Sequence, residues 1–169
     1  ATGTHRPNLG QELVSLVGED IAETYPVVNH DCRSRADQRR IGDIEGAPIE
    51  INSIYLDADV KILTGLIEPH PYAGYSGGAK SILPGLSSLE TMKFMHSFKM
   101  IAHPEVTNCV LKGNPFYEAT MEAARLAGAD FLVNALINKK KEPVAFVAGG
   151  LPAAHLAGCQ RVEETSVIR

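Results

Sequence analysis

The sequence predicts an α/β fold in which a mostly parallel or mixed sheet is flanked by helices. Helical patterns alternate with apolar, β-branched runs along the 169 residues, as α/β proteins require. The nearly continuous apolar run "ADVKILTGLIE" is typical of a buried strand, and "NPFYEATMEAARLAGAD" carries clear helix start and stop signals. With 44% hydrophobic and 21% charged residues, we expect residues 1–169 to form one soluble α/β domain with a sizeable core.

The first half of the chain is expected to supply a surface helix and two strands. The helix lies within residues 8–26, and Pro26 ends its pattern. Its apolar side is formed by Leu9, Leu13, Leu16 and Val17. Residues 46–56 and 58–68 read as strands, and we expect the second to be buried on both faces.

The second half is expected to supply three helices and a pair of strands. Residues 87–101 resume a helical period, with Ser87 and Glu90 spaced as a capping box. The next helix has Asn114 as its N-cap, Pro115 in its first turn and Gly128 as its terminator. Residues 130–138 and 142–150 read as strands joined by a lysine-rich turn, and residues 151–164 as a closing helix.

Composition argues against several classes of partner. A net charge of -4 and a pI near 5.9 give no basic face for nucleic acid, and the basic runs at 33–40 and 139–141 read as solvated turns. The spacing of Cys32, Cys109 and Cys159 suits neither a disulfide framework nor a zinc ribbon, which favours a reducing cytoplasm. No apolar run approaches the length needed to span a membrane.

The stretch "EPHPYAGYSGGAKSILPG", residues 68–85, resembles a phosphate-binding P-loop with one substitution, because Ala79 stands at the second required glycine. A P-loop lysine begins a helix, whereas Pro84 and Gly85 disfavour a helix directly after Lys80. A P-loop triphosphatase is therefore disfavoured. The ordinary alternative is a tight glycine turn with a surface lysine.

Six histidines accompany this loop along the chain. His70 lies between two prolines where a strand ends, a place where α/β proteins put ligands and catalytic groups. His96 shares a helical face with Leu89 and Met92, which is more typical of a core histidine than of a metal ligand. His5 stands in the polar motif T-H-R-P. The other three, His30, His103 and His155, have weaker cases, and His155 reads as ordinary helix.

Taken together, "ATGTHRP", "VVNHDC", "TGLIEPHPYAGYSGGAKSILPG", His96 and "GNPFYEA" resemble the nickel-dependent lactate racemase family. The resemblance runs along essentially the whole chain. It implies racemisation or epimerisation of a small 2-hydroxy acid by reversible hydride transfer to a nickel pincer nucleotide, a sulfur-bearing pyridinium mononucleotide that holds the metal.

Carried over by position, the resemblance assigns a role to each of several residues. Lys80 matches the lysine that tethers the cofactor, His96 the nickel ligand, and His5 with His70 the proton-transfer pair. The loop residues expected to approach the bound nucleotide are Gly74, Ser76, Gly77 and Gly78.

Members of the family extend well before the T-H-R-P motif and well beyond Arg169, into a second domain. Because this chain opens with Ala1 rather than methionine, we expect a piece of a longer, two-domain protein that is inactive without the rest of its parent chain. An oligomer is compatible with the sequence. A noncovalent nucleotide- or phosphate-binding domain without redox chemistry is the alternative function, and an inactive interaction module is disfavoured because Lys80, His70 and His96 are all present.

Overall fold

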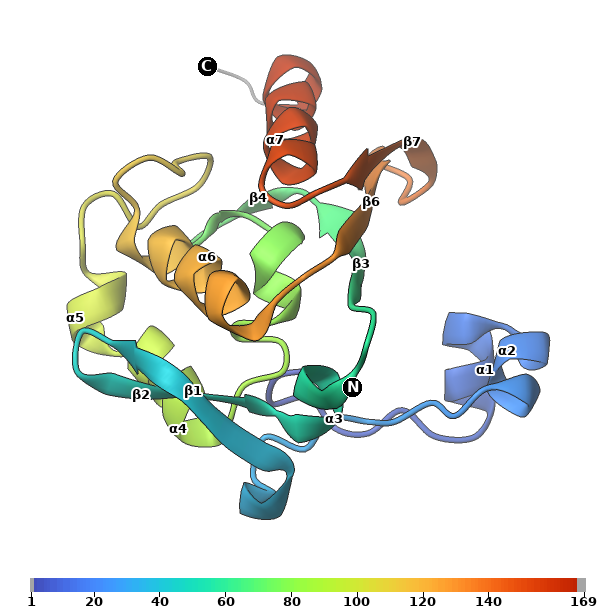
Figure 1. Ribbon diagram of the computed structural model, residues 1–169. Helices are drawn as coiled ribbons and strands as arrows, with labels where there is room; N and C mark the ends of the chain where they lie inside the picture. The colour runs from blue at the N-terminus through green and yellow to red at the C-terminus, as the bar shows by residue number, and fades with distance from the viewer. Residues whose placement is uncertain (1, 167–169) are drawn as a thin grey trace.

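The structure, a computed structural model, describes residues 2–166, so Ala1, with which the first family motif opens, lies outside them. Its main sheet has the order β3-β6-β7, formed by β3 (Ile62–Ile67), β6 (Phe131–Ile137) and β7 (Pro143–Gly149). Strand β3 runs parallel to β6, and β7 runs antiparallel to it. The predicted α/β class with a mixed sheet flanked by helices is confirmed (Figure 1).

The expectation that residues 58–68 are buried on both faces was wrong. Strand β3 lies at the edge of the sheet and buries Leu63 and Ile67, whereas Ile62 is 57% exposed. The same face stays open on the neighbouring strands, where Phe131 is 43% and Phe146 is 65% exposed. An apolar run therefore does not by itself show that both faces of a strand are covered.

Two long helices flank the sheet and the loop that follows β3. Helix α7 (Ala153–Ser166) packs against β6 and β7, and α6 (Pro115–Ala127) packs against β1 (Gln38–Ile44) (Figure 1). Helix α6 begins and ends as predicted, because the Asn114 side chain accepts a hydrogen bond from the Tyr117 amide and Gly128 follows at φ 80°.

A second sheet precedes β3. Strand β1 (Gln38–Ile44) pairs antiparallel with β2 (Ala47–Asn52). The first expected strand is thus shorter than predicted: it ends at Asn52, whose side chain caps α3 (Ser53–Asp57). The basic run at 33–40 is exposed but only partly a turn, since the 3-10 helix η1 (Arg35–Asp37) leads directly into β1.

The helix expected over 87–101 is divided into α4 (Leu89–Met95) and α5 (Phe98–Ile101). Its predicted capping box was wrong by one residue. Ser88 is the N-cap and accepts from the Thr91 amide, because the Ser87 side chain is buried and its hydroxyl donates to the Pro84 carbonyl. Glu90 pairs with Lys93 instead of reaching back to the cap.

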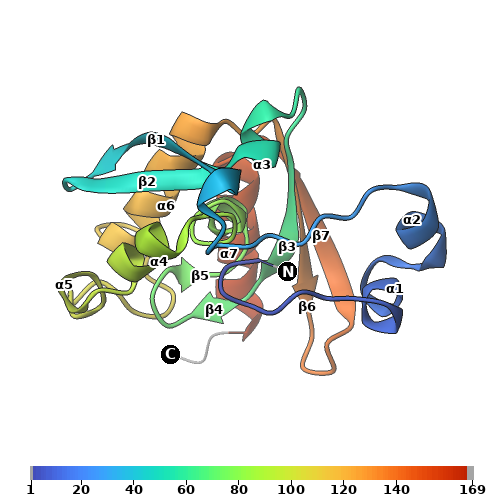
Figure 2. The same cartoon turned by 90° about the horizontal axis from the view of Figure 1, so that it is seen from below.

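The first predicted helix is likewise two helices, α1 (Gln11–Val17) and α2 (Glu19–Thr24), separated by Gly18 at φ 88°. Its surface position is confirmed, since neither helix buries a residue and Leu16 is 62% exposed. Figures 1 and 2 show that the pair projects away from the rest of the molecule.

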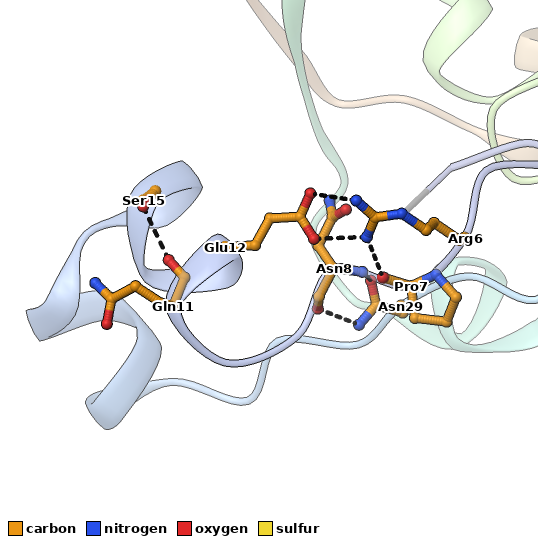
Figure 3. Close-up of polar contacts among 7 residues, drawn as sticks. All are labelled: Arg6, Pro7, Asn8, Gln11, Glu12, Ser15 and Asn29. Carbon is orange, nitrogen blue, oxygen red and sulfur yellow. Dashed lines mark hydrogen bonds and ion pairs between the residues drawn. The ribbon is translucent and has the colours of Figure 1, made fainter.

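The projecting segment, residues 8–29, is closed at its base by side-chain contacts (Figure 3). The Asn8 amide donates to Oδ1 of Asn29, and Nδ2 of Asn29 donates back to the Asn8 carbonyl, both at 3.0 Å. Next to this pair, the Arg6 guanidinium donates to both carboxylate oxygens of Glu12, at 2.6 and 2.9 Å. Residues 8–29 therefore form an excursion with a defined neck.

Two general expectations can be compared with the described residues. Within residues 2–166, no helix is both long and apolar enough to cross a membrane. The three cysteines are all free thiols, as their spacing predicts.

Candidate functional site

The lysine loop leaves β3 and is tied at once to the strand it came from. A small hairpin of β4 (Pro69–His70) and β5 (Gly74–Tyr75) opens it. The Ser76 hydroxyl then donates to the Leu66 carbonyl at 2.9 Å and accepts from the Glu68 amide at 3.0 Å. The loop continues into the 3-10 helix η2 (Gly78–Ser81), which contains Lys80. Four residues of 3-10 helix are not the α-helix of a P-loop, in agreement with the sequence argument.

Two side chains from distant elements hold the glycines of this loop. Asn134 on β6 accepts a hydrogen bond from the Gly78 amide at 2.8 Å, and His155 on α7 bonds through Nε2 to the Ser76 carbonyl at 2.9 Å. A Cβ on Gly77 would lie 2.5 Å from Oδ1 of Asn134, and one on Gly78 would lie 2.7 Å from the His155 ring. These close approaches explain why the packing requires glycine at positions 77 and 78. Contact of these glycines with a nucleotide stays a prediction.

Gly74 has a different neighbour. It has φ 75°, and a Cβ there would overlap the Val110 carbonyl. Its own carbonyl accepts from the Cys109 amide at 2.9 Å. Gly74 thus lets the chain before α6 pass close behind the loop.

The amine of Lys80 is in an unusual setting for a lysine. Burial lowers its pKa to about 8, against the opposing attraction of Glu68. At pH 8 about half of it is therefore the free amine, which is the nucleophilic form, and at pH 7 about a tenth. The reading of Lys80 as an ordinary surface lysine was wrong.

His70 is half-buried within a tight turn. Its Nδ1 accepts from the amides of Tyr72 and Ala73, both at 3.2 Å, so the neutral ring carries its proton on Nε2. Burial, with the positive charges of Lys80 and His96, lowers the pKa of His70 to about 4. His70 is consequently neutral at pH 7 and presents Nε2 as a hydrogen-bond donor.

His96 follows the last residue of α4 as its C-cap and is exposed, so its reading as a core histidine was wrong. Its Nδ1 lies 2.9 Å from the Met92 carbonyl, which can only accept, so Nδ1 carries the proton. In the neutral ring Nε2 is then left with a lone pair, as a metal ligand requires.

Aromatic contacts join the two histidines. Tyr72 makes edge contacts with His70 at 6.0 Å and with His96 at 5.9 Å between ring centroids. Phe116 at the start of α6 lies 5.7 Å from His96. The structure thus brings His70 and His96 close together. Lys80 lies in the same neighbourhood, because both Lys80 and His96 lower the pKa of His70 electrostatically.

His5 is not joined to this group by a hydrogen bond or ring contact in the described part of the chain; its exposed side chain lies on the N-terminal segment. That segment nevertheless lies against the site, because the Gly3 amide donates to the Gly85 carbonyl at 2.7 Å. A Cβ on Gly3 would lie 3.2 Å from Met92 of α4. Gly3, two residues before His5, therefore lies beside the helix that precedes His96.

The donor set limits what kind of metal group could be held. No three His, Cys, Asp or Glu side chains converge within residues 2–166. One imidazole with a free Nε2 fits a metal that arrives with its other donors already attached, and it does not fit a bare ion. The neighbouring free amine fits covalent attachment of such a group.

The remaining histidines have local roles. His30 is buried, with Nε2 at 3.0 Å from the Ser87 carbonyl and Nδ1 at 3.3 Å from the side-chain Nδ2 of Asn52, so it joins the "VVNHDC" segment to β2. Nδ1 of His103 accepts from the Glu105 amide. His155 lies in helix α7 as expected, and its ring also supports the loop.

Comparison with known proteins shows the family to which this chain belongs. Residues 1–108 match the model of the lactate racemase N-terminal domain family, a span that includes His5, His70, Lys80 and His96. The chain belongs to the lactate racemase N-terminal domain family. It is 37% identical over 169 residues to the lactate racemases of Thermoanaerobacterium thermosaccharolyticum and Lactiplantibacillus plantarum, covering 99% of this chain and 40% of each relative.

Solved structures extend the family comparison to the fold. The lactate racemase apoprotein of T. thermosaccharolyticum superposes with a TM-score of 0.94 at 38% identity, over 97% of this chain and 40% of that one. A Thermotoga maritima protein at 22% identity has a TM-score of 0.77 over 97% of this chain and 45% of its own, and shows the shared fold. The chain therefore spans about 40% of the length of its racemase relatives.

Proposed function

We propose that this chain is the cofactor-holding part of a lactate racemase-type enzyme that inverts C2 of a 2-hydroxy acid. The observation that carries the proposal is the grouping of His70, Lys80 and His96, in which an amine with a pKa of about 8 accompanies an imidazole with a free Nε2. Membership in the lactate racemase N-terminal domain family supports it independently.

Two residues would hold the cofactor. The free amine of Lys80 would form the covalent link to a nickel pincer nucleotide, and Nε2 of His96 would occupy one position on the metal. The loop backbone at Gly74, Ser76, Gly77 and Gly78 would lie along the nucleotide. When bound, this group supplies a hydride acceptor for the C2 hydrogen, which a 2-hydroxy acid does not release as a proton at useful rates.

The remaining chemistry concerns the proton of the substrate hydroxyl. Because the two enantiomers present this hydroxyl on opposite sides of C2, each side needs a proton acceptor, and His5 and His70 would be these two acceptors. His70 begins as an Nε2 donor, so it would first orient the hydroxyl oxygen. Accepting a proton at Nε2 requires a proton on Nδ1, and hence release of the Tyr72 and Ala73 amides. We therefore expect residues 70–73 to rearrange during the reaction.

The experiment that tests the function follows the C2 hydrogen. Protein expressed from its complete gene, together with nickel and the enzymes that make the pincer nucleotide, is given one enantiomer of lactate in D₂O. We expect racemisation with protium retained at C2, because a transferred hydride does not exchange with solvent. Deuterium at C2 would indicate proton abstraction instead, and an absence of racemisation across a panel of 2-hydroxy acids would contradict the proposal.

A variant separates the metal ligand from the tether. His96→Ala should lower bound nickel at least tenfold, with the fold unchanged by circular dichroism. His103→Ala, which removes another exposed histidine from the same region of the chain, is the matched control and should retain nickel. Equal nickel in both variants would remove His96 from the ligand role.

A further inference from the structure

Two buried polar side chains converge on the backbone just before Lys80. Asn134 is completely buried and His155 is 1% exposed, although they come from the middle of a strand and from a helix. One accepts from the Gly78 amide and the other contacts the Ser76 carbonyl. They therefore fix the peptide groups on both sides of Gly77, at the start of the 3-10 turn that contains Lys80.

Each of these side chains is held in one orientation. Nδ2 of Asn134 donates to the Val133 carbonyl at 3.0 Å, which leaves Oδ1 facing the loop. The His155 ring stacks on Tyr117, with centroids 6.2 Å apart, and Sγ of Cys159 lies 3.6 Å from its Nε2. Burial lowers the pKa of His155, so the ring is neutral, and because a carbonyl only accepts, its proton is on Nε2 toward Ser76.

Buried polar groups of this kind are costly unless they are hydrogen-bonded, and here the partners are loop backbone atoms. An apolar side chain at either position would fill the same space but leave the loop without its bond. The close approach of both side chains to Gly77 and Gly78 also leaves the loop little room to shift.

We propose that Asn134 and His155 are positioning residues, which hold residues 76–78 so that the Lys80 amine stays half-buried near His70 and ready to react. This inference rests on the proposed function only for the role of the Lys80 amine as the attachment point of the cofactor. The positioning itself can be measured without any cofactor.

The experiment measures the reactivity of Lys80 by competitive labelling. Protein expressed from its complete gene is treated with a trace of acetic anhydride at pH 8, and peptide mass spectrometry gives the labelling of Lys80 relative to the exposed Lys112. His155→Phe keeps a ring but removes the donor, and His155→Gln restores an N–H donor at a similar distance. Leu132→Ala, in the core on the same strand as Asn134, controls for a general loss of stability.

We expect His155→Phe to reduce relative labelling of Lys80 roughly fivefold, as a rise of one pKa unit from about 8 would do at pH 8. His155→Gln should restore it to within about twofold of wild type. Leu132→Ala should lower the melting temperature without changing the labelling ratio. Unchanged labelling in His155→Phe, no recovery in His155→Gln, or an equal loss in Leu132→Ala would overturn the proposal.

A measurement on the wild-type protein remains decisive if these variants fold poorly. The Gly78 amide, which donates to Asn134, should exchange with solvent as slowly as the paired amides of β6. Exchange at the rate of an open loop would contradict the positioning role. Because neither test uses the cofactor, a missing adduct on Lys80 would count against the proposed function and leave this inference standing.

Discussion

The lysine loop, residues 68–85, and the N-terminal excursion, residues 8–29, both contain a glycine with an unusual backbone conformation, but its surroundings differ. Gly77 (φ 73°, ψ -161°) and Gly18 (φ 88°, ψ 154°) both adopt backbone conformations that are essentially restricted to glycine. A Cβ on Gly77 would meet Asn134 and the Leu66 carbonyl, whereas a Cβ on Gly18 would meet nothing within 4 Å. The loop needs its glycine for both space and conformation, and the excursion needs it for conformation.

The same contrast holds for polar contacts. The loop is bonded to β6 and α7 by buried or half-buried groups and to β3 by a more exposed bond, whereas the excursion is closed by exposed or partly exposed pairs at its neck. Rigid support around Lys80 is what a residue with a defined chemical task requires. None of the proposed site residues lies within the excursion, residues 8–29.

The largest expected effect comes from alanine at the two glycines. Gly77→Ala adds overpacking against Asn134 to the backbone strain, so it should lower the free energy of unfolding by about 2 kcal/mol more than Gly18→Ala does. Urea titrations of both variants measure this difference. Equal losses would mean that Asn134 yields easily and the loop is not tightly packed.

Removing the amide side chains should give the next largest difference. Asn134→Ala leaves the Gly78 amide unpaired in a buried place and should cost about 2 kcal/mol. Asn29→Ala acts at the partly exposed neck of the excursion and should cost about 1 kcal/mol or less. Denaturant titrations measure both losses. A larger loss in Asn29→Ala than in Asn134→Ala would contradict the view that the loop is held more firmly than the excursion.

The charge of Lys80 should be measurable as a pH dependence. With its folded pKa at about 8 and its unfolded pKa near 10.5, folding releases its proton, so this site destabilises the fold below pH 8 and the penalty disappears as pH rises toward 10.5. Lys80→Met should therefore raise stability at pH 7 by about 1–2 kcal/mol, after allowance for partial exposure.

The matched variant, next to the neck of the excursion, is Arg6→Met, since the Arg6 side chain is 73% exposed in its pair with Glu12. It should leave the pH dependence between pH 7 and 10 unchanged. A stability gain in Lys80→Met that stays constant up to pH 10.5 would show that the amine is not buried.

The last prediction concerns His70. Its folded pKa of about 4 lies below the usual 6.5, so its neutral form is favoured by folding, and stability should fall by about 1–2 kcal/mol as pH drops from 6.5 to 4. His70→Gln should flatten that part of the stability curve. Coinciding pH dependences of the wild type and this variant, measured by thermal unfolding, would show that folding does not favour the neutral form of His70.

Sequence predicted the parts of the fold that depend on local signals. Helix α6 follows from its Asn114 cap, Pro115 and Gly128, and the β6–β7 pair from two apolar runs around a lysine turn. It also singled out the residues that gather at the site, His70, Lys80 and His96, through their positions around one loop and their resemblance to a family.

What sequence missed depends on contacts between distant residues. Strand β1 was hidden by its arginines, and the open face of β3 could not be read from its apolar residues. Asn134 did carry a signal, because a polar residue inside an apolar strand needs a buried partner. His155 carried none, since its partner Ser76 lies 79 residues away.

The most direct test of the central claim, that Lys80 is the attachment point of the cofactor, is the mass of the intact protein under denaturing conditions. The protein is made from its complete gene with nickel and the pincer-making enzymes, and digestion locates any added mass. We predict an adduct on the peptide containing Lys80, absent from Lys80→Arg. An unmodified Lys80, in a host that loads a known lactate racemase, would contradict the tether and favour noncovalent nucleotide binding.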